Sequence, residues 1–340
     1  MSADSPINVA VVGVGAFGRN HARIYHQMSQ AGEAVRLVGV ADADVARADA
    51  IAAEFGCKAF GSVEQMLSTR NEVHCASLAV PTIQHFESAR LLMESGVDIL
   101  IEKPLASSLA EADELIAVEQ RSGRIAQVGH LERFNPAVRA TLPLITQPMF
   151  FEVHRLSVFT RRSLDVDVVL DLMIHDLDVV LTFVKSPITD IRAVGLPILS
   201  GKVDIANVRL EFASGCVANF TASRISTERI RKLRFFQPKQ YISLDYGRQD
   251  VMVFSVGEKT PTAATPSVNT EIGITRPPVV AEEPLHAEIA SFLNAVRGRS
   301  GPEVSLRDGR NALEAALNII SVIERHGKRV NLEGMRELSS

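Results

Sequence analysis

The sequence predicts an α/β protein in which a doubly wound parallel sheet is followed by an α+β domain built on a largely antiparallel sheet. Three observations favour this class. Short aliphatic runs alternate with helical patterns over residues 1–128, a glycine-rich turn follows the first run, and strands after residue 150 alternate apolar with polar residues. Strand–helix alternation is typical of parallel sheets covered on both faces, and polar–apolar alternation of antiparallel sheets with one wet face.

The N-terminal elements are predicted from unbroken apolar runs and from helical periodicity. The runs that predict buried strands are Ile7–Val12, Val35–Val40, Cys75–Val80, Val97–Ile101 and Ile125–Val128. The helical patterns between them are Arg19–Met28, Asp44–Phe55, Ile83–Glu94 and Leu109–Arg121. Ser107 and Ser108 are N-cap candidates for the last helix, with Glu111 in its first turn. His21 and His26 are expected on a helix surface.

The second half predicts a strand at Phe150–Phe159 and one buried helix at Val168–Val184. Further strands are expected at Thr189–Ile198, Val203–Phe212, Val217–Ile225, Arg231–Gln237, Tyr241–Tyr246 and Val251–Val256. Gly257–Pro284 is rich in Pro, Thr and Ala, which predicts an irregular arm. Two helices follow, at Pro284–Arg297 and Leu306–His326.

Length and composition limit the function classes. A chain of 340 residues suits two domains of about 150 residues each. We place them at 1–128 and 129–300, with a C-terminal helix in 301–340 that packs back on the first domain. The formal net charge of −4 argues against nucleic-acid binding. No apolar run reaches the ~18 residues of a membrane span, so we expect no membrane partner.

The N-terminus and the cysteines indicate a compartment. No basic stretch precedes the first strand, so we expect no signal peptide. Cys57, Cys75 and Cys216 are far apart and form no Cys-x-x-Cys pair. We therefore expect neither a disulfide framework nor a metal site, and a reducing cytoplasm fits.

A Gly-x-Gly-x-x-Gly motif, formed by Gly13, Gly15 and Gly18, lies between the first strand and the first helix. The glycines allow a tight turn, close approach of a pyrophosphate, and packing of helix on strand. With Ala16 and Phe17 at the helix N-terminus, the motif predicts a Rossmann dinucleotide site. The alternative is a tight turn without a ligand.

Asp42 ends the second strand, where a carboxylate accepts hydrogen bonds from the adenosine ribose. No Lys or Arg adjoins Asp42 to meet a 2′-phosphate, so NAD is preferred to NADP as cofactor. Arg47, one turn further on, moderates that preference.

Two further motifs stand where later strands end. One is Pro81-Thr82-Ile83-Gln84-His85, and the other is Glu102-Lys103-Pro104. Carboxyl ends of parallel strands line the ligand crevice of such a sheet. Pro104 holds Lys103 extended, and a lysine beside a nicotinamide ring can hydrogen-bond a substrate hydroxyl. A surface Glu–Lys pair is the alternative.

The helical stretch in the second half carries titratable groups. Asp171, His175 and Asp178 are spaced to share one face of an otherwise apolar helix. Buried charges need partners, so this face suggests a site, with a structural polar cluster as the alternative. Histidine suits proton transfer from a hydroxyl.

In combination these motifs resemble the glucose–fructose oxidoreductase / inositol dehydrogenase / MocA family, over nearly the whole chain. The resemblance implies an NAD-dependent dehydrogenase whose catalytic residues fall on Lys103, Asp171 and His175. It also implies cofactor contacts from Pro81, Thr82, His85, Glu102 and Lys103. His175 would accept the hydroxyl proton, oriented by Asp171, with the nicotinamide lying between the domains. Family members often carry glycine midway between Asp and His, where this chain has Met173.

The resemblance extends to substrate contacts. The stretch that joins the domains in family members falls on residues 127–136, which implies Arg133 and Asn135 as substrate contacts. Basic residues also gather at Arg224–Lys239, and Arg155, Arg161 and Arg162 precede the catalytic helix. We take Arg162 and Arg224 from these groups as candidates for an anion-binding lip. A charged strand edge is the alternative.

Two stretches, 128–137 and 165–176, resemble family members that oxidise UDP-N-acetylglucosamine at C3 and feed a transaminase in the lipid A diamino-sugar pathway. This implies a nucleotide-sugar substrate. The alternatives are a dehydrogenase of a free polyol or sugar such as inositol, and a non-catalytic NAD(H)-binding protein. The antiparallel sheet needs a cover on one face, so we also expect a homodimer or homotetramer.

Overall fold

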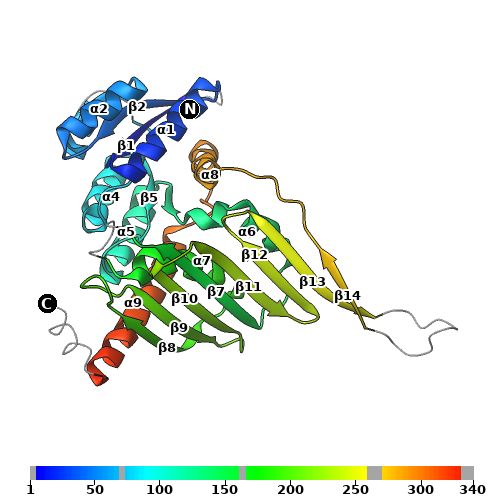
Figure 1. Cartoon of the computed structure of the whole chain (residues 1–340). Helices are drawn as coiled ribbons and strands as arrows, with labels where there is room; N and C mark the ends of the chain where they lie inside the picture. The colour runs from blue at the N-terminus through cyan, green and yellow to red at the C-terminus, as the bar shows by residue number, and fades with distance from the viewer. Residues whose placement is uncertain (1–4, 69–72, 161–165, 259–269, 331–340) are drawn as a thin grey trace. The chain divides into compact units, whose positions relative to one another are not determined.

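The computed structural model describes residues 5–68, 73–160, 166–258 and 270–330 (Figure 1). Its contacts divide the chain into two units. The first comprises Met1–Phe134 with Glu283–Leu313, and the second Asn135–Glu282 with Glu314–Ser340. Among the described residues, no helix combines the length and the apolar character needed to cross a membrane.

The first unit is built on a six-stranded sheet in the order β3-β2-β1-β4-β5-β6, with all paired strands parallel. The strands are β1 (Ile7–Val12), β2 (Val35–Ala41), β3 (Lys58–Phe60), β4 (Cys75–Leu78), β5 (Asp98–Glu102) and β6 (Ala126–Gly129). Every residue of β1, β4, β5 and β6 is buried, as their aliphatic composition requires when both faces are covered. The doubly wound parallel sheet is confirmed. β3 was not predicted, because three residues carry no periodicity.

The helices of the first unit follow the strands. They are α1 (Ala16–Gln30), α2 (Val45–Phe55), α3 (Val63–Ser68), α4 (His85–Glu94), α5 (Leu109–Ser122) and α8 (Pro284–Gly298), with single turns η1 (Thr82–Gln84) and η2 (Leu131–Phe134). Ser108 caps α5 as predicted, since its hydroxyl accepts from the Glu111 N–H. The Glu111 carboxylate accepts in turn from the N–H of Ser107, the residue before the N-cap.

The contacts divide the chain differently from the predicted boundaries. Helix α8, placed by us in the domain 129–300, belongs to the first unit, because Leu285, Ile289 and Phe292 lie in one apolar core with residues of α1 and β1. The last helix, α9 (Leu306–Arg329), is divided. Its residues up to Leu313 group with the first unit, and those from Glu314 onward group with the second.

The second unit is built on an eight-stranded sheet in the order β14-β13-β12-β11-β7-β10-β9-β8, which Figure 1 shows from yellow to green. The strands are β7 (Phe150–Val158), β8 (Ile188–Leu196), β9 (Ile205–Phe212), β10 (Val217–Ser226), β11 (Ile230–Gln237), β12 (Gln240–Asp245), β13 (Asp250–Glu258) and β14 (Thr270–Thr275). Only β7 and β10 pair in parallel, so the largely antiparallel sheet is confirmed. The irregular arm is a partial error, because Thr270–Thr275 pairs with β13.

One face of this sheet is covered by α7 (Ile174–Val184). Phe183 of α7 packs on Phe151 and Phe235, which are neighbours on β7 and β11 with ring centroids 5.2 Å apart. The shorter helices α6 (Pro136–Thr141) and η3 (Leu142–Leu144) precede β7. A five-residue π-helical turn, Val169–Met173, leads into α7, so the predicted single helix has two geometries.

The opposite face of the sheet carries a row of apolar side chains. Phe150, Phe236, Tyr241, Phe254 and Ile274 stand directly opposite one another on five adjacent strands. Their aromatic rings lie in contact, with centroids 5.9, 4.9 and 5.1 Å apart along the row. Phe236 is 39% exposed and Ile274 is 61% exposed. We call these five residues the cross-strand row.

Candidate functional site

The glycine motif forms a tight turn between β1 and α1. Gly13 has a φ of +80°, and a Cβ there would lie 2.7 Å from the Ala79 carbonyl carbon. A Cβ on Gly18 would lie 1.8 Å from the Gly13 carbonyl oxygen, so the third glycine lets α1 pack on the turn. No side chain caps α1 at Gly15. The first N–H groups of α1 are therefore available to an anionic ligand.

A cavity of about 960 Å³ opens at this turn. Its lining includes six residues predicted to bind the cofactor: Gly13, Gly15, Ala16, Phe17, Asp42 and Pro81. The size and the bare helix N-terminus fit a dinucleotide with its pyrophosphate at α1. NAD is thus compatible with the residues present, with the glycine turn holding its phosphates.

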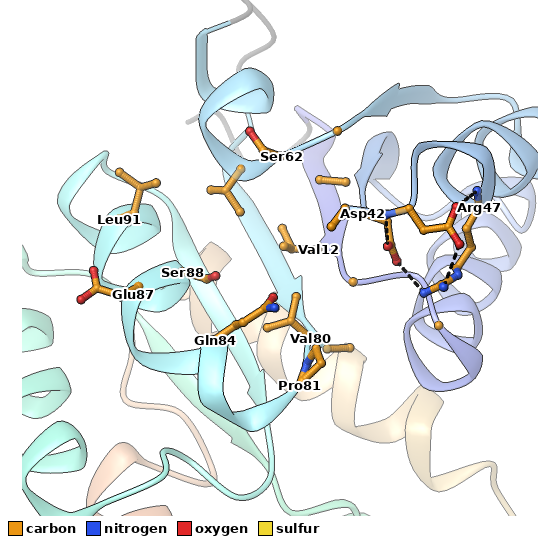
Figure 2. A pocket seen from close by; sticks show the side chains of 18 of the residues that line it. Val12, Asp42, Arg47, Ser62, Val80, Pro81, Gln84, Glu87, Ser88 and Leu91 are labelled. Atoms are coloured by element: carbon orange, nitrogen blue, oxygen red, sulfur yellow. Dashed lines mark hydrogen bonds and ion pairs between the residues drawn. The ribbon is translucent and has the colours of Figure 1, made fainter. Parts of the chain in front are cut away.

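Asp42 lies at the end of β2 with its carboxylate turned toward the glycine turn (Figure 2). One oxygen accepts from the Val14 N–H at 2.8 Å, and the other from the Asp44 N–H at 2.9 Å. The Arg47 guanidinium lies 3.3 Å from Asp42 and 2.9 Å from Asp44. Arg47 is thus held by two carboxylates, which weakens its attraction for a 2′-phosphate and fits the preference for NAD.

Five predicted cofactor residues are not part of the cavity lining: Gly18, Thr82, His85, Glu102 and Lys103. Of these residues, His85 is almost fully buried. Its Nδ1 lies 2.9 Å from the Pro104 carbonyl oxygen, and its Nε2 lies 2.9 Å from the Val80 carbonyl oxygen. Burial lowers the pKa of His85, although the two carbonyl contacts act to raise it. A neutral imidazole carries one N–H, so the ring donates to one of the two carbonyl oxygens at a time. His85 joins the two motifs and does not line the cavity.

Residues missed by the sequence line the other wall of the cavity. They come from the turn after β3, from α3, from η1 and from α4: Ser62, Glu64, Gln84, Glu87, Ser88, Arg90 and Leu91. Figure 2 shows Gln84, Glu87, Ser88 and Leu91 along one helical segment, across the cavity from Asp42 and Arg47. Their position in the sequence could have indicated this role, because these residues lie in segments that follow the carboxyl ends of strands in the sheet.

Glu102 is the last residue of β5 and is buried, while Lys103, the next residue, is half-buried. The Glu102 carboxylate contacts the His21 Nε2 at 3.0 Å. The expectation that His21 lies on a helix surface is wrong, because its side chain is fully buried. The periodicity of α1 carries the missed signal, since Gly18, His21 and Tyr25 lie on its buried side.

In the second unit, Asp171 lies in the π-helical turn and His175 in the first turn of α7. Both are half-buried, whereas Asp178 is buried. The π-helical turn changes the angular spacing that an α-helix would give, so the predicted common face for all three does not follow from regular helical geometry. Asp171 and His175 remain four residues apart at the junction of the two helical geometries.

Arg155, which the sequence grouped with an anion-binding lip, is buried in an ion pair. Its Nε lies 2.6 Å from the Asp176 carboxylate, and both side chains are nearly inaccessible. Its guanidinium also stacks 5.2 Å from the centre of the Tyr246 ring. Arg155 therefore stabilises the second unit and is not presented to a ligand.

The four predicted substrate contacts have different environments. Arg224 is buried, lies 3.3 Å from the Asp204 carboxylate, and donates to the carbonyl oxygens of Val166 and Val203. Asn135 is also buried. It caps α6 and donates to the Tyr246 carbonyl oxygen. Both side chains therefore have protein partners within the second unit.

Arg133 is mostly buried and lies 3.5 Å from the Asp308 carboxylate. Arg162 falls outside the described residues. Lys232 and Arg234 of β11 lie on the open sheet face, where they approach the acidic partners Asp245 and Glu152 at 3.9 Å.

Comparison with protein families matches both units. Residues 7–130 match the model described as an oxidoreductase family with an NAD-binding Rossmann fold, and residues 144–239 match the GFO/IDH/MocA C-terminal domain. The chain belongs to the GFO/IDH/MocA oxidoreductase family. It is therefore an NAD-binding oxidoreductase, as the sequence motifs predicted.

Relatives of this chain include sugar and polyol dehydrogenases. A UDP-N-acetylglucosamine 3-dehydrogenase of Acidithiobacillus ferrooxidans is 36% identical over 319 residues, which is 94% of this chain and 97% of the relative. A solved structure of that enzyme superposes with a TM-score of 0.84, covering 94% of this chain and 98% of the other. An NAD⁺-dependent scyllo-inositol 2-dehydrogenase of Bacillus subtilis is 27% identical over 65% of this chain and 68% of the relative.

Proposed function

We propose that this protein oxidises the C3 hydroxyl of UDP-N-acetylglucosamine and transfers the hydride to NAD. The observation that carries the proposal is the 36% identity to the UDP-N-acetylglucosamine 3-dehydrogenase over 94% of the chain. The product would be a 3-keto nucleotide sugar, a substrate suited to a transaminase of the lipid A diamino-sugar pathway.

Three residues would carry the chemistry. His175 accepts the proton of the reacting hydroxyl, and Asp171 orients the imidazole. Lys103 hydrogen-bonds the same oxygen and stabilises its developing negative charge. NAD, when bound, accepts the hydride. The half-buried state of Lys103, Asp171 and His175 supports this assignment, because each is shielded from bulk water and still open to a ligand.

A second candidate is the oxidation of a free polyol such as an inositol. The observation in its favour is that Arg155 and Arg224 are buried in ion pairs, so the basic cluster gives no support to a diphosphate site. The nucleotide-sugar proposal therefore depends on the sequence relationship. Of the predicted substrate contacts, Arg133 is half-buried and could take part in this role.

The experiment is NADH formation by the purified protein with UDP-N-acetylglucosamine, with N-acetylglucosamine and inositols in parallel. The proposal expects turnover with the nucleotide sugar, a loss of about 10²-fold or more in kcat for His175→Ala, and little change in NAD affinity. Turnover with inositols alone would establish the second candidate. Full activity of His175→Ala would remove the proton-acceptor assignment.

We further propose that the protein is a homodimer or homotetramer in the cytoplasm. The cross-strand row supports a second copy of this chain as its cover, because exposed Phe236 and Ile274 extend one apolar strip across five strands. The cytoplasmic location is supported by three free cysteines, Cys57, Cys75 and Cys216.

A further inference from the structure

A buried polar cluster lies beneath the end of β5, outside the cavity at the glycine turn. His21 of α1 contacts Glu102 through Nε2 at 3.0 Å and the Ser77 hydroxyl through Nδ1 at 3.1 Å. The Tyr25 hydroxyl lies 2.8 Å from the same Ser77 hydroxyl. These side chains form one continuous network from α1 to the strand end that precedes Lys103.

Glu288 of α8 completes this cluster. Its side chain is fully buried, and neither carboxyl oxygen has a hydrogen-bond partner among the described residues. One of these oxygens, a Glu102 oxygen and a His21 ring nitrogen all lie within 4.8 Å of one another. A buried carboxyl group without a partner is costly, so the arrangement calls for a ligand among the three side chains.

A single water molecule satisfies this geometry. A water oxygen placed among three atoms with these separations is within hydrogen-bond distance of all of them. Two buried carboxylates so close together cannot both be ionised at low cost, and one of them therefore keeps a proton. Burial and the charge of Glu102 raise the pKa of Glu288 well above its usual value, so Glu288 is the protonated partner.

We propose that Glu288 is a positioning residue that, through a buried water, hydrogen-bonds Glu102 and His21 and so fixes the end of β5 from which Lys103 extends. The inference rests on the proposed function, because it assigns Glu288 to the placement of Lys103. Glu288 itself is not part of the cavity lining.

The packing of Glu102 explains how such a contact reaches Lys103. A Cβ on Gly129 of the neighbouring strand β6 would lie 2.8 Å from the Glu102 carboxylate, so that carboxylate fits closely against the Gly129 backbone. Glu102 is thus held between β6, His21 and Glu288. Because Lys103 is the next residue, a displacement of the Glu102 backbone also displaces the backbone from which the lysine side chain starts.

The titratable groups that face Glu288 are His21 and Tyr25 of α1 and Glu102 of β5, and η2 with its buried Glu132 packs on α8. Burial raises the pKa of Tyr25 well above its usual range, so its hydroxyl remains neutral. Burial and the charge of Glu102 favour the protonated form of Glu288.

The first test is protein stability as a function of pH, with Glu288→Gln as the variant. In the wild type the folded-state pKa of Glu288 exceeds the unfolded one, so its contribution to stability is full below the unfolded pKa and is lost as pH rises toward the folded pKa. The amide holds no such proton. The melting temperature of Glu288→Gln relative to wild type should therefore rise as the pH increases from about 5 toward the folded-state pKa of Glu288. A difference that is constant with pH would overturn the proton assignment.

The second test separates positioning from structure by kinetics. Glu288→Leu, which cannot hydrogen-bond, should lower kcat about tenfold with NAD affinity unchanged, and Glu288→Gln should restore most of it. Ile289→Ala, a buried neighbour in the same core, is the control that loses stability with kcat retained. The proposal would be overturned if Glu288→Leu kept the wild-type kcat. It would also be overturned if Glu288→Gln lost as much kcat as Glu288→Leu.

Elemental analysis of the purified protein tests whether a metal ion, and not a water molecule, lies between Glu288, Glu102 and His21. A divalent cation bound in a one-to-one ratio to wild type and absent from Glu288→Gln would overturn the water-mediated contact, because a metal requires the ionised carboxylate. If wild type oxidises none of the sugars offered, the proposed function fails. The pH dependence of stability still decides whether Glu288 holds a proton.

Discussion

The carboxylate of Asp42 accepts a hydrogen bond from the backbone N–H of Val14, at 2.8 Å. The residue predicted to bind the ribose therefore also holds the glycine turn that is to bind the pyrophosphate. Removal of this side chain affects two parts of the same ligand site.

Asp42→Ala should weaken NAD binding about tenfold, equivalent to ~1.4 kcal/mol. Arg47 should keep only Asp44 as a partner, so affinity for NADP should improve relative to NAD. Calorimetric titration with both cofactors measures the change. Asp49→Ala is the matched control, because Asp49 is an exposed carboxylate on helix α2 that does not line the cavity. Unchanged NAD affinity in Asp42→Ala would mean that another residue binds the ribose.

Lys103→Met and His175→Ala should each lower kcat by about 10²-fold, and the double variant should lose less than the product of the two. Both groups are proposed to act on one proton transfer, so the second removal costs less once the first is made. Steady-state NADH formation on the four proteins gives the coupling. Lys58→Met, an exposed lysine of β3, serves as control. Independent, fully multiplicative losses would contradict a shared step.

Arg155→Met should destabilise the second unit by about 3–5 kcal/mol, because it leaves the buried Asp176 carboxylate without its partner. Replacing both partners, with Asp176→Leu added, should recover much of the loss. Urea unfolding measures both effects. Arg192→Ala, which removes an exposed ion pair with Asp190, should change stability by less than ~0.5 kcal/mol. A small effect of Arg155→Met would show that Asp176 finds another partner or a proton.

Phe236→Arg combined with Ile274→Arg should dissociate the proposed oligomer, since both side chains are exposed on the cross-strand row. Light scattering at micromolar concentration should then give the mass of one chain. Arg209→Ala, on the open face of β9, is the control that should keep the wild-type mass. A wild type that is already monomeric would contradict the oligomer proposal itself.

Strand positions in the first unit were predictable because parallel strands are buried on both faces. Ile7–Val12 matches β1 without a shift, since all six residues are buried and five of them are apolar. Asp42 and the glycine turn followed from the same order of elements. In contrast, β14 was hidden in a stretch rich in Pro and Thr, because an edge strand needs only one partner to form.

Buried charges account for most of the site errors. Arg155 and Arg224 look like any surface arginine in sequence, and only the fold brings Asp176 and Asp204 to them. Glu288 and Glu102 are 186 positions apart, so no local pattern reveals their approach. Sequence patterns report the periodicity of one element, whereas such contacts depend on how separate elements pack.

The two carbonyl contacts of His85 have a kinetic consequence. They connect Val80, which lines the cavity, to Pro104, which follows Lys103. Cofactor that settles against Val80 should restrict the loop that carries the lysine, so we expect a compulsory order of addition, NAD before sugar. Product-inhibition patterns distinguish this order from random addition. In His85→Ala the two loops are no longer joined, and the order should become random.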